Sequence, residues 1–135
     1  MADADFIYRV VESTMRRYVE QTWGHFSEEL TRKGVAKMIA AGWCSIIEFE
    51  GEDIGVLSVE RRPDQIRLAQ LFIVPSHQNR GIGTSILRDL AREARQAGRP
   101  LKLRLLSVNP ARRLYEREGF RISSSTPERI YMELR

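Results

Sequence analysis

The chain has 135 residues, of which 42% are hydrophobic and 30% charged, a composition that suits a globular protein with a buried core. Its net charge of +4 comes from basic residues interleaved with acids, and it holds no recognisable DNA- or RNA-binding module, so we expect no nucleic-acid binding. We also expect no membrane association, because no apolar run could span a bilayer and the N-terminus lacks a signal-peptide pattern. The single cysteine, Cys44, cannot form an internal disulfide, which favours the cytoplasm. The length predicts one domain, residues 1–135.

Two helices are expected in the N-terminal third. Residues 5–23 begin with a short apolar segment, FIYRVV, and then place Val11, Met15 and Tyr18 on one helical face. Ser27 is an expected N-cap for a second helix, which continues to about Ala41.

The hydrophobic period becomes that of strands after Trp43. Residues 44–50 and 54–60 flank a turn and predict a hairpin, and the turn RRPDQ leads to a third strand that ends at Pro75. These connections are short, so the three strands are expected to be antiparallel neighbours.

A helix follows over residues 81–97, with Gly98 as its C-terminal glycine, and LKLRLLSV is the next strand. The order strand, helix, strand predicts a parallel pair. Asn109 is expected to cap a helix whose first residue is Pro110, and two short strands end the chain. The sequence therefore predicts an α/β fold with a mixed central sheet flanked by helices.

The join between the third strand and the next helix, PSHQNRGIGT, has the features of a phosphate site. A helix N-terminus offers unpaired N–H groups, its two glycines allow a ligand to approach the main chain, and Arg80 adds positive charge. A dinucleotide fingerprint would need a third glycine near Ile86, and a P-loop would need Gly-Lys-Ser/Thr. Both are absent, and a turn that uses glycine only for tightness stays open as the alternative.

The segments VPSHQNRGIGTSIL and NPARRLYEREGF, together with the order of elements, resemble the GNAT superfamily of acetyl-CoA-dependent N-acetyltransferases. The resemblance implies the GNAT-like acyl-CoA N-acyltransferase fold over nearly the whole chain. It also implies transfer of an acetyl group from acetyl-CoA to a primary amine, by direct attack in a ternary complex. The family usually begins with a strand, which here is either FIYRV or missing.

The resemblance also implies a set of cofactor-binding residues. The backbone from Gln78 to Thr84 would hold the pyrophosphate of coenzyme A, and the main chain of the preceding strand would pair with the pantetheine arm. Asn109 would contact that arm, although a helix cap explains it equally well, and Arg112 and Arg113 would face the adenosine phosphates or solvent. The implied set is Phe72, Ile73, Val74, Gln78, Asn79, Arg80, Gly81, Ile82, Gly83, Thr84, Asn109 and Arg112.

Tyr115 is the catalytic residue that the resemblance implies, as the general acid that protonates the departing thiolate. A phenol, with a pKa of about 10, is protonated at neutral pH and suits that role. The alternative is a core tyrosine packed with Leu114 and Phe120. Relatives often place a glutamate as general base in the strand before the pyrophosphate turn, where this chain has Ala69 and Gln70.

Glu60 is the candidate general base, with His25, Glu48 or a water chain as alternatives. By resemblance, Trp23 and His25 lie in the wall of the substrate site. The acceptor stays open between a small amine, an amino acid, an antibiotic and a protein amine, and a homodimer is one candidate assembly. We expect no metal site, because the two histidines and Cys44 lack ligand spacing. An acyl-CoA-binding module without turnover is the alternative function.

Overall fold

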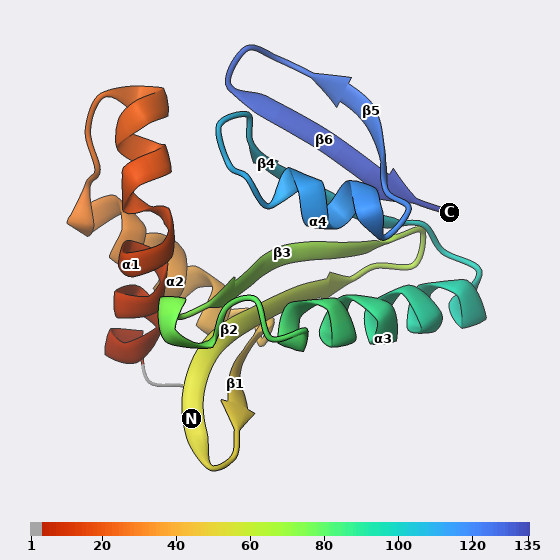
Figure 1. The fold of residues 1–135 in the computed structure, drawn as a ribbon, viewed down its shortest axis with the longest axis horizontal. Coiled ribbons are helices and arrows are strands. Elements are labelled where there is room, and N and C mark those ends of the chain that lie inside the picture. The colour runs from red at the N-terminus through yellow and green to blue at the C-terminus, as the bar shows by residue number, and fades with distance from the viewer. Residues whose placement is uncertain (1–3) are drawn as a thin grey trace.

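The computed structural model describes residues 4–135, which form one six-stranded sheet with helices on both faces (Figure 1). The strand order is β1-β2-β3-β4-β6-β5. The elements are α1 (Ala4–Trp23), α2 (Glu28–Ala40), β1 (Cys44–Phe49), β2 (Glu52–Arg61), β3 (Ile66–Ile73), the short 3₁₀ helix η1 (Pro75–His77), α3 (Ile82–Ala97), β4 (Leu101–Leu106), α4 (Arg112–Arg117), β5 (Arg121–Ser125) and β6 (Arg129–Leu134).

The sheet is mixed, as predicted. The β1–β2 and β2–β3 pairs are antiparallel, β3 and β4 are parallel, and β6 lies antiparallel between β4 and β5. The parallel pairing is short, because it joins only Ile66–Leu68 to Leu101–Leu103. Beyond that point β3 and β4 diverge, which Figure 1 shows in the middle of the molecule.

Each face of the sheet has its own hydrophobic cluster. On one face, α3 and α4 contribute Leu87, Leu90 and Tyr115 to a cluster with residues of β2, β3, β4 and β6. On the other, α1 and α2 pack Ile7 and Val35 against β2. A polar or charged residue in the middle strands therefore faces one of two helical layers, and strand alternation decides which.

The segment FIYRV belongs to a helix, so a strand at this position is ruled out. α1 already begins at Ala4, and Ile7, Val10 and Val11 lie at helical spacing on its buried face. Within residues 4–135 the sheet thus starts with β1, and the first strand usual in the family is missing from this part of the chain. Burial of this apolar stripe explains why a helix forms where a short apolar run alone is ambiguous.

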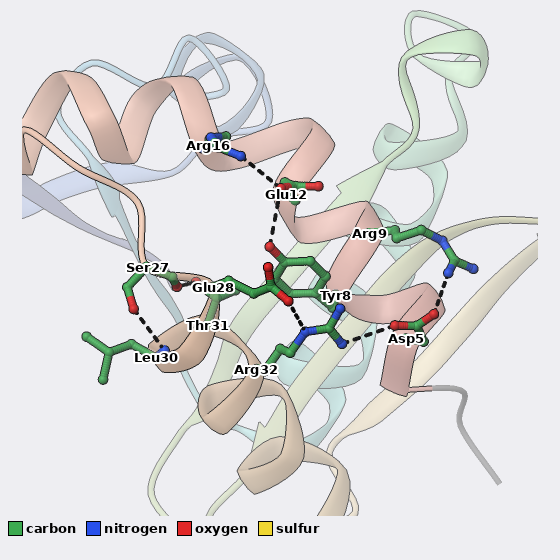
Figure 2. Close-up of polar contacts among 10 residues, drawn as sticks. All are labelled: Asp5, Tyr8, Arg9, Glu12, Arg16, Ser27, Glu28, Leu30, Thr31 and Arg32. Atoms are coloured by element: carbon green, nitrogen blue, oxygen red, sulfur yellow. Dashed lines mark hydrogen bonds and ion pairs between the residues drawn. The ribbon is translucent and has the colours of Figure 1, made fainter.

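The cap of α2 is confirmed, since the Leu30 backbone N–H donates to Ser27 Oγ at 3.1 Å. Figure 2 shows how the two helices are joined. Arg32 of α2 donates to Glu28 at 2.8 Å and to Asp5 of α1 at 3.0 Å, and its guanidinium lies 4.0 Å from the centre of the Tyr8 ring. These contacts fix α2 against α1 beside the sheet.

The glycine ends of α3 are confirmed, with left-handed backbone at Gly81 (φ 81°) and Gly98 (φ 67°). α4 begins at Arg112, two residues later than predicted. Asn109 still holds the turn before it, because its Oδ1 accepts a hydrogen bond from the Ala111 N–H at 2.9 Å. None of the described helices is long and apolar enough to cross a bilayer.

Candidate functional site

A cavity of about 750 Å³ lies where β3 and β4 diverge. Its wall includes Thr14 of α1 on one side of the sheet and Thr84 of α3 on the other. Because α1 and α3 cover opposite faces, the cavity passes through the gap between the two strands and offers access from both layers.

A β-bulge marks the start of the gap. In the β2–β3 pair, Ser58 is opposite Gln70 and Val59 is opposite Leu68, which leaves Ala69 as an extra residue on β3. The last parallel β3–β4 pair is Leu68 with Leu103. A bulge bends its strand and increases the local twist, so β3 turns away from β4 at this residue. The bulge explains why a cavity opens inside an otherwise continuous sheet.

The gap exposes main-chain groups of β3. The Val74 N–H donates to the Ile54 carbonyl of β2 at 2.8 Å. Along a strand, the main-chain N–H and C=O groups of successive residues point to opposite sides. Those of Phe72 therefore point to β2, as at Val74, whereas those of Leu71 and Ile73 point into the gap between β3 and β4. The Ile73 carbonyl there accepts a hydrogen bond from Gln78 Nε2 at 2.8 Å. The strand-like contacts expected for residues 72–74 are therefore available mainly at Leu71 and Ile73.

The N-terminus of α3 closes one end of the cavity. The N–H groups of Ile82, Gly83 and Thr84 have no intrahelical carbonyl to bind, since they belong to the first turn. A Cβ on Gly83 would lie 3.6 Å from the Ile73 side chain, which shows how closely this turn approaches β3. The helix dipole adds positive potential at the same place.

Nine of the twelve predicted cofactor residues line the cavity. They are Phe72, Ile73, Gln78, Asn79, Gly81, Ile82, Gly83, Thr84 and Asn109. The other three lie outside the lining. Val74 packs with the α1–α2 cluster, Arg80 is exposed, and Arg112 forms an ion pair with Glu116 at 3.4 Å. Arg113 and Arg117, one helical turn apart on α4, line the cavity instead.

Tyr115 is a core residue that also borders the cavity, and its role as general acid stays a prediction. It lines the cavity, and its ring also packs edge-to-face on Phe120 at 5.7 Å between ring centres. Only 8% of the residue is exposed, and burial raises the pKa of its phenol to about 12. The hydroxyl is therefore protonated throughout the neutral range.

Glu60 lies on β2, outside the cavity lining, and pairs with Arg67 near the start of β3, whereas the cavity lies along the later residues of that strand. Its carboxylate accepts from Arg62 at 2.6 Å and from Arg67 at 3.1 Å. The hydrogen bond from Arg62, supported by Arg67, lowers the pKa of Glu60 below its usual value. This placement favours a structural ion pair, and the role of Glu60 as base stays a prediction.

The residues predicted for the acceptor wall also lie outside the lining. Trp23 is 46% exposed at the end of α1, with the Arg129 guanidinium 5.5 Å from its ring, and His25 is exposed in the following link. The structure instead brings Thr14, Met15 and Tyr18 of α1 to the cavity. Sequence periodicity placed Met15 and Tyr18 on the buried face, but it could not separate a cavity wall from a core.

Arg104 and Gln70 are two further lining residues that sequence reasoning gave no role. No Asp or Glu is among the described residues of the lining. Within residues 4–135, no three His, Cys, Asp or Glu side chains are grouped as metal ligands would be.

Comparison with solved structures finds the same fold in proteins of low sequence identity. The PaiA N-acetyltransferase from Thermoplasma acidophilum, solved with coenzyme A, is 15% identical with a TM-score of 0.74, covering 97% of this chain and 91% of its own. An acetyltransferase from Thermus thermophilus is 19% identical with a TM-score of 0.75, covering 98% and 90%. A GNAT family acetyltransferase from Elizabethkingia anophelis with acetyl-CoA bound is 16% identical with a TM-score of 0.63, covering 86% of each chain.

A search of curated proteins gives no significant sequence match. A sequence model described as an acetyltransferase (GNAT) domain matches residues 40–122, more than half of the chain. This span holds the hairpin, the bulge, the α3 turn, β4 and the Tyr115 helix, which together build most of the cavity. The chain belongs to the GNAT acetyltransferase family.

Proposed function

We propose that this protein transfers an acetyl group from acetyl-CoA to a primary amine by direct attack in a ternary complex. The observation that carries the proposal is the cavity in which the α3 N-terminus, the free edge of β3 and the Tyr115 side chain meet. Coenzyme A in one of the similar structures and acetyl-CoA in another support the same class of ligand here.

Coenzyme A would use three parts of this cavity. Its pyrophosphate would accept hydrogen bonds from the N–H groups at the start of α3, where the dipole favours negative charge. Arg113 and Arg117 line the same cavity and would pair with further phosphate oxygens. The amide groups of the pantetheine arm would pair with the main chain of Leu71 and Ile73, in the manner of an added strand.

In the reaction, the amine nitrogen attacks the thioester carbonyl carbon. The C–N bond forms, the C–S bond breaks, and the departing thiolate takes a proton from the Tyr115 hydroxyl. The proton that the amine loses returns to the tyrosine oxygen through water, so the products are the acetylated amine and free coenzyme A. The described lining contains no carboxylate, and both ring nitrogens of its histidine, His77, already face protein groups, Nδ1 facing Ser76 Oγ at 2.9 Å and Nε2 facing Glu52 at 4.0 Å. Water is therefore the proton route that we propose.

The test is thiol release from acetyl-CoA with a panel of amines, by wild type and Tyr115→Phe. We expect the variant to lose roughly 100-fold or more in kcat, the usual contribution of a general acid, while coenzyme A binds both proteins equally in calorimetry. Release by Tyr115→Phe at the wild-type rate would contradict the assignment of Tyr115 as the acid.

An acyl-CoA-binding module without turnover is the second candidate function. The absence of Asp and Glu from the described lining favours it, since an acetyltransferase often supplies a base there. Tight binding of coenzyme A by wild type, without thiol release for any amine, would establish this alternative.

A further inference from the structure

The two layers of the sheet divide the cavity into a donor side and an acceptor side. The α3 N-terminus, Arg113 and Arg117 belong to the α3–α4 layer, where the polyanionic cofactor has its positive partners. Thr14, Met15 and Tyr18 belong to α1 on the opposite layer. An acceptor would therefore reach the thioester from the α1 side, through the gap between β3 and β4.

Arg104 lies on the acceptor side. Its neighbours Leu103 and Leu105 belong to the α3–α4 cluster, so strand alternation directs Arg104 to the α1 layer. The side chain is exposed and lines the cavity. No acidic group within residues 4–135 is within ion-pair distance of its guanidinium, unlike Arg62, Arg67, Arg88 and several others.

Gln70 lies on the same layer, on the neighbouring strand. Its partner Ser58 is fully buried and donates from Oγ to Gln70 Oε1 at 3.1 Å. The Cys44 sulfur is 2.9 Å from the same Ser58 oxygen, and Cys44 packs against the α1–α2 cluster. Because the one hydroxyl hydrogen of Ser58 is donated to Gln70 Oε1, the Cys44 thiol is the donor in its contact with Ser58.

The other end of the Gln70 amide is a free donor. No protein atom within residues 4–135 accepts from its Nε2, and the same residues contain no fully buried side-chain nitrogen or oxygen without a partner. Nε2 is therefore accessible, and Gln70 lines the cavity. A cation on β4 and an N–H donor on β3 thus flank the opening on its acceptor side.

We propose that the acetyl acceptor is an amine that also carries a carboxylate, bound by the Arg104 guanidinium and the Gln70 amide. This inference rests on the proposed acetyltransferase function. A carboxylate accepts strong hydrogen bonds from a guanidinium, and it would also accept one from the Gln70 Nε2 donor. A polycationic acceptor would instead need acidic groups, and the described lining of the cavity has none.

The first experiment measures thiol release from acetyl-CoA with three matched sets: free amino acids, their amides, and the amines that remain without the carboxyl group, with spermidine as a polycation. We expect at least one amino acid to exceed its amide and amine by roughly 10-fold or more in kcat/KM. A tripeptide with N-terminal aspartate carries the same two groups on a longer chain. A preference for it that depends on Arg104 would assign the carboxylate to a peptide.

The second experiment repeats the best substrate with Arg104→Gln. We expect a loss of roughly 10- to 100-fold in kcat/KM, mainly through KM for the acceptor, and an unchanged KM for acetyl-CoA. Arg121→Gln, which removes an exposed arginine of β5 outside the cavity, is the charge-matched control and should have no effect. Gln70→Leu should also raise the KM for the acceptor, because it removes the amide donor. Ser58→Ala should do the same, because it removes the hydrogen bond that orients the Gln70 amide.

Two results would overturn the inference while leaving the proposed function intact. One is turnover confined to amines without a carboxylate, spermidine included, and the other is an Arg104→Gln effect no larger than that of Arg121→Gln. No thiol release with any amine would instead be the failure of the proposed function, so the two failures are distinguishable.

Discussion

Tyr115 is a buried residue of the cavity wall, and burial sets the pH range over which its phenol stays protonated. Its pKa is raised to about 12 in the folded chain, against an ordinary value of 10.0. Between these values the unfolded chain loses the phenol proton while the folded chain keeps it. Folding stability from this group is thus complete below pH 10 and falls as the pH rises toward 12.

We therefore expect wild type to lose on the order of 2 to 3 kcal/mol between pH 9 and pH 12 through this group, whereas Tyr115→Phe lacks this part of the loss. Urea unfolding of both proteins across that range measures it. Tyr131→Phe is the matched control, since Tyr131 is a half-buried tyrosine of β6 outside the cavity lining. If wild type and Tyr115→Phe lost the same free energy of unfolding between pH 9 and pH 12, the expectation would be contradicted.

A substitution at Glu60 tests whether its carboxylate has a structural or a catalytic role. Its two arginine partners are expected to keep it ionised and away from proton transfer. Glu60→Gln should lower the unfolding temperature and leave kcat and its pH profile unchanged, as should Glu93→Gln, which removes another arginine-paired carboxylate. A fall in kcat confined to Glu60→Gln, with loss of the acid limb of the profile, would establish Glu60 as the base.

At the scale of the element, α3 has a left-handed glycine at each end, but only the N-terminal one lines the cavity. Alanine at Gly81 or Gly98 meets no atom within 4 Å, so strain at positive φ, about 1 kcal/mol, is the shared cost. Gly81→Ala should in addition disturb the N–H groups that face the proposed phosphates.

We expect both variants to unfold at similarly lowered temperatures, and only Gly81→Ala to bind coenzyme A more weakly, by roughly 10-fold. Thermal unfolding and calorimetric titration give the two readouts. Equal affinities for coenzyme A would show that the start of α3 is not the phosphate site.

Across the whole molecule, acid should destabilise the fold through paired carboxylates. Asp5, Glu60, Glu93 and Glu118 each have a lowered pKa, first of all because an arginine donates a hydrogen bond to the carboxylate. A lowered folded pKa gives stability that is present above the unfolded value and is lost as the pH falls through the folded one.

The unfolding temperature should therefore be constant near neutral pH and fall below about pH 4.5, where these groups begin to protonate in the unfolded chain. Calorimetry from pH 7 to pH 2.5 measures the fall. The main arginine partners are about half exposed, whereas the Glu60 and Glu118 side chains are only 11% exposed, so 0.5 M salt should reduce the fall only in part. An unfolding temperature independent of pH in this range would show that these pairs contribute nothing.

Much of the fold could be predicted because local physics determines it. The Ser27 cap, the Gly81 and Gly98 ends of α3, the β1–β2 hairpin and the β3–α3–β4 crossover all follow from spacing and turn chemistry. The glycine turn that begins α3, which we propose as the phosphate site, is likewise a local feature, since a helix N-terminus and its glycines are adjacent in the chain. The apolar run at residues 6–10 could not be assigned from sequence, because five residues are too few to distinguish the 3.6-residue period of a helix from the two-residue period of a strand.

The rest was decided by tertiary structure, because it depends on residues that are distant in the chain. The bulge at Ala69 exists only relative to the register of β2, and it opens the gap that makes a cavity. The packing of α4 on the sheet decides that Arg113 and Arg117 line the cavity and that Arg112 does not. Arg104 and Gln70 have no local pattern in common; they share a side of one opening because strand alternation and the divergence of β3 from β4 place them there.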